Sequence, residues 1–270
     1  MRQTLFTLLC ILFIRTLSAQ TYEVTNLRVS AFSHNYECGT DGAFSDPEPN
    51  FRVNWRPTGG IFGALTVGIF AWISINQFGL LNMIDLPIWA ELLIAIAFLD
   101  LVAQYLAHYM LHKVQWMWKF HLVHHSDTHV DVTSATRHHP GDYFCREIFA
   151  LFAIFIFGIP LAYYLIYRFI TVFFTYFTHA NINMPRALDK AIGYIFVTPH
   201  MHKFHHHREL PWTDSNFGNI FSVWDRMFGT LTYDDPTKIV YGLDIVDESR
   251  DQDIAYQFKL PFDKTVKYKS

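Results

Sequence analysis

Two apolar runs dominate the first half of the sequence: "IFGALTVGIFAWISINQFGLL" at residues 61–81 and "IWAELLIAIAFLDLVAQYLAHYM" at residues 88–110. Only the connector "NMIDLP" separates them. Each run is about 20 residues long, which is the length that an α-helix needs to cross roughly 30 Å of hydrocarbon. The pair therefore predicts a helical hairpin embedded in a membrane.

A second apolar block covers residues 148–179 and contains Gly158, Pro160 and Arg168. It is too short for two full perpendicular spans and a turn, so we expect one limb to be short or re-entrant. The pattern leaves the turn open anywhere between Gly158 and Arg168. Together the two blocks predict an all-α integral membrane protein with about four membrane-embedded helices.

The composition agrees with a membrane protein. Hydrophobic residues make up 51% of the chain and charged residues only 17%, which is too apolar for an ordinary soluble domain. The net charge of -3 carries no basic excess, and this argues against nucleic acid as a partner. The 3 cysteines lie far apart in the sequence, so they predict neither a disulfide framework nor a Cys-x-x-Cys site.

The chain divides into four expected regions. Residues 1–20 have a basic start, a short apolar run and a small-residue ending, which is typical of a signal-like apolar leader; its cleavage stays open. Residues 21–60 are expected to be a polar, loop-rich N-terminal segment. Residues 61–235 would form the membrane domain, and residues 236–270 a polar C-terminal tail.

Basic residues predict the orientation of the spans. They lie before the first span, between the two apolar blocks and after the second block, while the connector "NMIDLP" has none. Because cytosolic loops carry the excess of Lys and Arg, the histidine-rich segments are expected on the cytosolic side. A cleaved leader would place them on the opposite side, and we favour the charge pattern over that reading.

Histidines recur at spacings that suit metal binding. One pair is spaced i, i+4 at the end of the second apolar run, and two later segments repeat the pattern H-x-x-H-H: His108 and His112; His121, His124 and His125; His202, His205 and His206. Residues three and four apart lie on one helix face, so each triplet can form half of a metal cage if it is helical. Eight imidazoles exceed what one metal ion accepts, which predicts two ions. Imidazole suits iron, zinc, copper and nickel alike.

Two motifs that mark other kinds of site, for a dinucleotide cofactor and for a protease zinc ion, are absent from the sequence. No G-x-G-x-x-G follows a predicted strand, so reducing electrons would have to come from another protein. No H-E-x-x-H zinc protease motif is present. A non-enzymatic transporter or sensor for zinc or iron is the competing hypothesis, but it should place polar ligands inside the spans, whereas the histidine motifs lie outside them or at their ends.

The motifs "HYMLH", "HLVHHSDTHVDVTSATRHHP", "FTHANI" and "HMHKFHHHRELPWTDSNFGNIFSVWDRMFGT" resemble the fatty acid hydroxylase and sterol desaturase superfamily of membrane di-iron oxygenases. The resemblance covers residues 61–235. It implies two iron ions, molecular oxygen as co-substrate, and electrons from an external donor, either a b-type cytochrome or a ferredoxin with its reductase. It also implies a cytosolic helical cap that carries a histidine-rich di-metal site.

The resemblance implies ten metal ligands: His108, His112, His121, His124, His125, His139, His179, His202, His205 and His206. His138 stands next to His139, and which of the two faces metal is open, with His139 favoured. Asp127, Asp131 and Asp225 are candidates to accept hydrogen bonds from the outer nitrogens of ligand rings.

A short amphipathic helix is expected within "DSNFGNIFSVWDRMFGT", either covering the metal site or resting on the membrane surface. The expected reaction is oxidation of a lipid C–H bond that depends on molecular oxygen, with hydroxylation favoured over desaturation. The substrate stays open among a sterol, a fatty acyl chain, a sphingoid base, an alkyl ether lipid and a carotenoid.

Overall fold

The computed structural model describes residues 56–235 and 238–266, with side chains from residue 63 onward. The expectations for the leader and for most of residues 21–60 lie outside these residues. Ile61–Ser270 forms one compact unit, which holds nearly all of the described elements. In the described residues the fold is all-helical, and the one β-bridge is an isolated pairing of Phe196 with Phe221.

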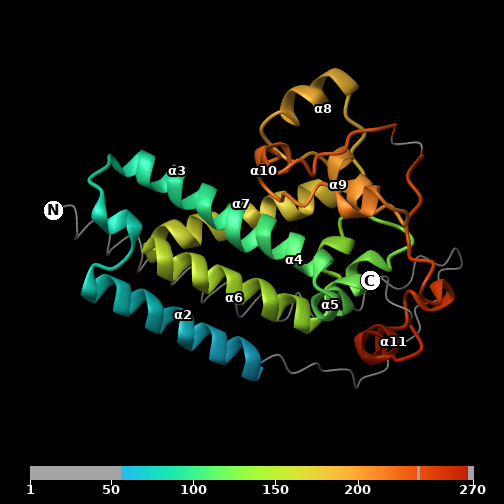
Figure 1. Cartoon of the computed structure of the whole chain (residues 1–270), viewed down its shortest axis with the longest axis horizontal. Coiled ribbons are helices and arrows are strands. Elements are labelled where there is room, and N and C mark those ends of the chain that lie inside the picture. Colours follow the sequence, from blue (N-terminus) through green and yellow to red (C-terminus); the bar gives the residue numbers. More distant parts are fainter. Residues whose placement is uncertain (1–55, 236–237, 267–270) are drawn as a thin grey trace, which may run out of the picture. The chain divides into compact units, whose positions relative to one another are not determined.

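The described helices have these bounds: α2 Arg56–Asn76, α3 Ile88–Leu99, α4 Ala107–Lys113, α5 Gln115–His125, α6 Pro140–Phe157, α7 Leu161–His179, α8 Arg186–Ile192, α9 Pro199–His205, α10 Val223–Met227 and α11 Ile254–Lys259. A π-helical segment, Asp100–Leu106, joins α3 to α4 without a break. Short 3-10 turns lie at Leu80–Met83, Ser134–Thr136, Trp212–Asp214, Glu248–Arg250 and Leu260–Phe262. Figure 1 shows these helices in the order of the chain.

The predicted first hairpin is confirmed. Helix α2 and the continuous α3–α4 rod account for two candidate membrane spans, Gly63–Met83 and Ile88–Lys113, and α7 accounts for a third, Leu161–His179. These described segments are long and apolar enough to cross a membrane.

The turn of the second hairpin lies at Gly158, which ends α6 in the left-handed conformation with φ of 65°. Pro160 then starts α7. Gly79 of the first hairpin packs directly on this turn, since a Cβ on Gly79 would lie 2.2 Å from the Gly158 nitrogen. Arg168 therefore belongs to the middle of α7, and its guanidinium pairs with Glu147 of α6 at 3.1 Å. This pairing explains how a charge is tolerated in an apolar helix.

Helix α6 differs from the other long helices. It runs beside α7 but is not among the three candidate spans, because its N-terminal half carries Asp142, Arg146 and Glu147. The expected count of four embedded helices is therefore not confirmed, although α6 and α7 do form the second hairpin.

One apolar core joins the long helices. Buried side chains from α2, α3, α6 and α7 pack together, among them Phe70, Leu99, Ile154 and Tyr167. Large apolar side chains such as Phe152 and Phe169 are instead exposed on the outside of α6 and α7. An exposed apolar face on a helix is typical of contact with lipid.

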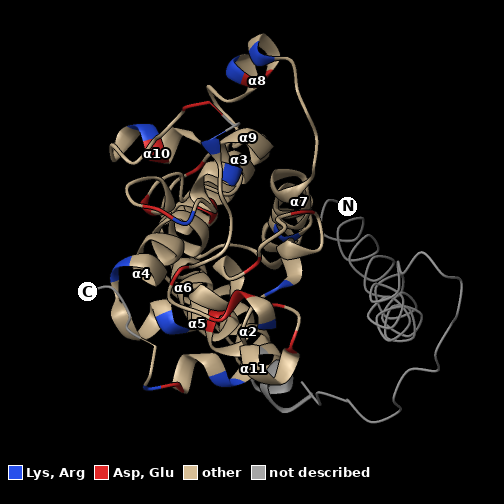
Figure 2. Cartoon of the chain, turned by 90° about the vertical axis from the view of Figure 1, so that its right-hand side faces the viewer, with Lys and Arg blue, Asp and Glu red and all other residues tan. Residues whose placement is uncertain are grey.

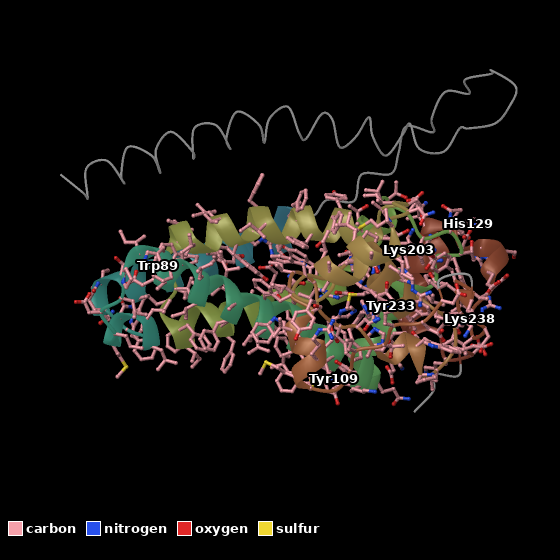
Figure 3. All side chains as sticks on the ribbon, turned by 90° about the horizontal axis from the view of Figure 1, so that it is seen from above. Trp89, Tyr109, His129, Lys203, Tyr233 and Lys238 are labelled. Atoms are coloured by element: carbon pink, nitrogen blue, oxygen red, sulfur yellow. The ribbon has the colours of Figure 1, made fainter. Side chains whose placement is uncertain are left out.

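The two ends of the Ile61–Ser270 unit differ in the residues that they carry. Figure 3 shows Trp89, at the start of α3, at one end, and His129 and Lys238 at the other. Basic residues gather on the elements that follow the second hairpin, for instance Arg186 and Lys190 of α8 and Arg226 of α10 (Figure 2).

The C-terminal segment differs from the expected polar tail. Leu243, Leu260 and Val266 pack against Leu122 and Val123 of α5 in a separate small core. Apolar side chains at these positions give the segment a buried face, which a solvated tail would lack. Residues 238–266 therefore cover α5, the helix that carries the first H-x-x-H-H motif.

Candidate metal centre

Nine histidines from four helices converge in two adjacent groups. The five-histidine cluster consists of His108, His112, His121, His125 and His205. The four-histidine cluster consists of His124, His179, His202 and His206. Helices α4, α5 and α9 supply the first group, and α5, α7 and α9 with its C-cap supply the second. Nine of the ten expected ligands are thus brought together.

Each H-x-x-H-H motif is divided between the clusters, which differs from the expectation that each triplet forms one half-cage. His121 and His125, four residues apart, face the five-histidine cluster, while His124 faces the other. Neighbouring residues on an α-helix point about 100° apart, so His124 and His125 cannot face one ion. The motif therefore bridges two sites, and His205 is divided from His202 and His206 in the same way.

The outer ring nitrogens of five histidines contact oxygens that can only accept hydrogen bonds. Nδ1 of His121 lies 2.5 Å from Asp142, and Nδ1 of His112 lies 3.3 Å from Asp214. The Nδ1 atoms of the other three contact backbone carbonyls: His108 contacts Phe217, His179 contacts Thr175 and His205 contacts Ser215. Each of these Nδ1 atoms must carry the proton, which leaves a lone pair on Nε2.

The Nε2 atoms face one another at the distances that metal ligands adopt. Nε2 of His108 lies 3.0 Å from Nε2 of His121, and Nε2 of His179 lies 3.1 to 3.2 Å from three neighbours. A metal ion with bonds of about 2.1 Å to nitrogen places its adjacent ligand atoms about 3.0 to 3.4 Å apart. Lone pairs aimed at each other would repel, so both clusters fit a bound cation.

Burial keeps the imidazoles neutral. His121 and His205 are fully buried, and His124, His125 and His206 are nearly so. Burial lowers the pKa of His121 to about 3, against the opposing effect of Asp142. Burial, reinforced by neighbouring imidazoles, holds the pKa of His205 well below its usual range. Neutral imidazole is the form that binds metal, so the site is ready for cations at neutral pH.

The two clusters differ in the hydrogen-bond partners of their Nδ1 atoms. In the five-histidine cluster only His125 has a buried Nδ1 without a hydrogen-bond partner. In the four-histidine cluster this holds for His124, His202 and His206. In the described part of the chain, carboxylates contact the first group alone, through Asp142 and Asp214. Such partners orient a ligand ring and increase its basicity.

His139 is not brought into either cluster, contrary to the favoured expectation. Its Nδ1 accepts the Gly141 N–H and caps α6, and its ring stacks on Phe120. The cause is local, because a residue before proline is held extended and here forms the N-cap of the helix. His138 lies nearer the centre, with its ring stacked on His124 at 4.2 Å and its Nδ1 3.1 Å from Asp142.

None of the aspartates selected from the sequence contacts a ligand ring. Asp127 accepts from Ser134, Asp131 from Thr133, and Asp225 from backbone amides of residues 217 and 218. Asp142 and Asp214 do contact ligand rings, and neither of them was predicted from the sequence.

Asp142 is a fully buried carboxylate beside the five-histidine cluster. It accepts from His121, His138 and Arg146. Burial opposes its ionisation, but Arg146 and the two histidines together hold its pKa well below the usual range. The carboxylate is therefore charged at neutral pH and can partly balance the charge of a bound cation.

Comparisons with known proteins agree with this geometry. Residues 92–230 match the family model for fatty acid hydroxylase. The chain is 28% identical over 213 residues to alkylglycerol monooxygenase of Caenorhabditis elegans, which covers 75% of this chain and 39% of the relative. It is 30% identical over 127 residues to ornithine lipid hydroxylase OlsE of Rhizobium tropici, which covers 47% and 38%.

Human alkylglycerol monooxygenase is 29% identical over 185 residues, covering 66% of this chain and 38% of the relative. The chain thus spans about two fifths of the length of these relatives. No solved structure matches it. The family match covers more than half of the chain and includes all nine clustered histidines, which confirms the resemblance seen in the sequence: the chain belongs to the fatty acid hydroxylase family.

Proposed function

We propose that this protein is a membrane-bound di-iron oxygenase that hydroxylates a lipid. The observation that carries the proposal is the convergence of nine histidines, eight of them buried, as groups of five and four whose Nε2 atoms face inward. When bound, two iron ions would supply the redox chemistry with molecular oxygen that oxidises a C–H bond.

The chain's own residues prepare this site. Asp142 and Asp214 hold the Nδ1 protons of His121 and His112, so the rings keep one tautomer and one orientation. The buried surroundings keep bulk water from the ligands.

Several features support a lipid substrate. His108, His112 and His179 lie at the ends of candidate spans, so the clusters adjoin the region where acyl or alkyl chains would lie. The two kinds of relatives described above are named for acting on an alkylglycerol and an ornithine lipid. Both names denote insertion of oxygen, which favours hydroxylation over desaturation here. The choice among sterol, fatty acyl, sphingoid, alkyl ether and carotenoid substrates stays open.

Hydroxylation places one atom of dioxygen in the product and releases the other as water, which consumes two electrons and two protons. The sequence has no G-x-G-x-x-G dinucleotide motif, so the electrons are proposed to come from an external b-type cytochrome, or from a ferredoxin with its reductase. We place the histidine clusters on the cytosolic side, where such donors would have access.

The test uses the iron-loaded full chain in lipid vesicles with a reducing partner, ¹⁸O-labelled dioxygen and a membrane lipid extract. The expected result is a lipid with one added hydroxyl group that carries the label. A reduced, iron-loaded protein that consumes no oxygen with any lipid class, yet moves iron or zinc across the vesicle membrane, would replace this function with that of a transporter.

A further inference from the structure

The loop between the 3-10 turn Trp212–Asp214 and α10 holds two ligand rings through its backbone. The Phe217 carbonyl lies 2.9 Å from Nδ1 of His108, and the Ser215 carbonyl lies 2.7 Å from Nδ1 of His205. Both rings belong to the five-histidine cluster. The orientation of this loop's peptides therefore fixes where the Nε2 atoms of these rings point.

A single buried carboxylate holds the peptide that faces His108. Asp225 is 1% exposed; its Oδ1 accepts from the Phe217 N–H at 2.8 Å, and its Oδ2 accepts from the Gly218 N–H at 2.9 Å. The hydroxyl of Thr230 donates to Oδ1 as well. In a trans peptide the N–H and C=O groups point in opposite directions. Fixing the Gly218 N–H on Asp225 therefore aims the Phe217 C=O toward His108.

The close packing at Gly218 supports the same arrangement. A Cβ at this position would lie 2.9 Å from Oδ2 of Asp225 and 2.7 Å from the Phe221 carbonyl. No side chain fits between the loop and the carboxylate. The peptide can thus approach Asp225 only because residue 218 is glycine.

We propose that Asp225 is a positioning residue for the five-histidine cluster, acting through the Phe217–Gly218 peptide to set the tautomer and direction of the His108 ring. The inference rests on the metal-binding part of the proposed function and is independent of the lipid chemistry. It gives Asp225 of the "WD" pair a role that acts through the loop backbone and not by direct contact with a ligand ring. The ligand ring that this peptide contacts, His108, belongs to the five-histidine cluster and not to the four-histidine cluster.

Asp100 also accepts hydrogen bonds from this loop and provides a matched comparison for Asp225. It is fully buried and accepts from the amides of Ile220 and Phe221 and from the indole of Trp224. The carbonyl of Ile220 accepts from Val197 rather than from a ligand ring. Asp100 and Asp225 thus anchor neighbouring parts of one loop through backbone amides, but only Asp225 anchors the peptide that contacts His108.

The experiment titrates the metal-free full chain in detergent with Co²⁺ against a competing chelator, because visible Co²⁺ bands report each site separately. The wild type should bind two ions. Asp225→Asn should weaken one site about tenfold to 100-fold, the range seen when outer partners of ligands are lost, and leave the other unchanged. Asp100→Asn should lower the melting temperature but keep both affinities within about twofold of wild type.

A double-mutant cycle tests the route through His108. If Asp225 acts through this ring, Asp225→Asn in a His108→Ala background should cause no further loss of affinity. Gly218→Ala, which displaces the same carboxylate, should weaken the same site and serves as the test if Asp225→Asn does not fold.

The proposal fails if Asp225→Asn binds both ions with wild-type affinity, or if Asp225→Asn and Asp100→Asn weaken both sites equally, since the carboxylate would then act only on stability. A wild-type chain that binds no Co²⁺ would overturn the metal centre of the proposed function as well.

Discussion

The outer nitrogen of each ligand ring determines which way the inner nitrogen points. Asp142 and Asp214 hold two rings of the five-histidine cluster, whereas three rings of the four-histidine cluster have no such partner. Single residues outside the ligand set should therefore affect the two clusters differently.

Asp142→Asn should weaken metal binding at the five-histidine cluster by about tenfold to 100-fold, because the amide carries no charge and serves His121 less well as an acceptor. Metal affinity measured by chelator competition checks this. Asp127→Asn is the matched control, since Asp127 is also buried and paired with an arginine but contacts no ligand ring. Equal losses of affinity in the two variants would contradict the role given to Asp142.

His139→Ala should retain two metal ions per chain. His139 caps α6 and stacks on Phe120, so its removal should cost about 1 kcal/mol of stability and no ligand. Metal content by mass spectrometry and thermal melting in detergent are the measurements, with His124→Ala as the comparison that should lose an ion. A His139→Ala protein that lacks one of its two ions would place His139 among the ligands after all.

At the scale of helices, spacing in the sequence predicted much of the site. The i, i+4 pair His108 and His112 and the two H-x-x-H-H triplets do converge, although each triplet is divided between the clusters instead of forming one half-cage. The number of rings predicted two ions, and the nine clustered rings form two groups. The hairpin of α2 and α3 followed from the length of the apolar runs.

Other features depend on contacts between distant parts of the chain, which no local spacing encodes. Asp142 reaches His121 across 21 residues, and the Phe217 carbonyl reaches His108 across 109. His138 and His139 are neighbours with equal chemistry, and only the N-cap geometry of α6 separates them. The buried face of residues 238–266 likewise appears only when α5 is placed against it.

Leu260→Ala should destabilise the protein by about 2 to 5 kcal/mol, because Leu260 is fully buried in the small core with Leu122 and Val123 of α5. Both α5 residues flank ligand histidines, so the metal-free protein should melt at a lower temperature than wild type. Val240→Ala, at a side chain that is 49% exposed, should change stability by less than about 0.5 kcal/mol. A melting temperature unaffected by Leu260→Ala would show that the C-terminal segment does not support α5.

At the scale of the whole molecule, the charge pattern predicts the orientation in the membrane. Thr136→Cys and Met83→Cys, in a background without the native cysteines, place one thiol near the histidine end and one near the turn of the first hairpin. Both positions are exposed, and Met83 is 79% exposed. An impermeant thiol reagent on intact cells should label Met83→Cys and not Thr136→Cys. The reverse pattern would place the histidine clusters outside.

The central claim is that two adjacent histidine clusters hold two iron ions. Anaerobic loading with ⁵⁷Fe followed by Mössbauer spectroscopy tests it most directly, because the spectrum counts the ions and separates their environments. Wild type should hold two irons per chain with distinct spectra, because one cluster has five histidines, two of them paired with carboxylates, and the other has four histidines without such a pairing in the described residues. His112→Ala should alter one spectrum and His202→Ala the other. Saturation at a single iron, or one spectrum changed by both variants, would contradict the account.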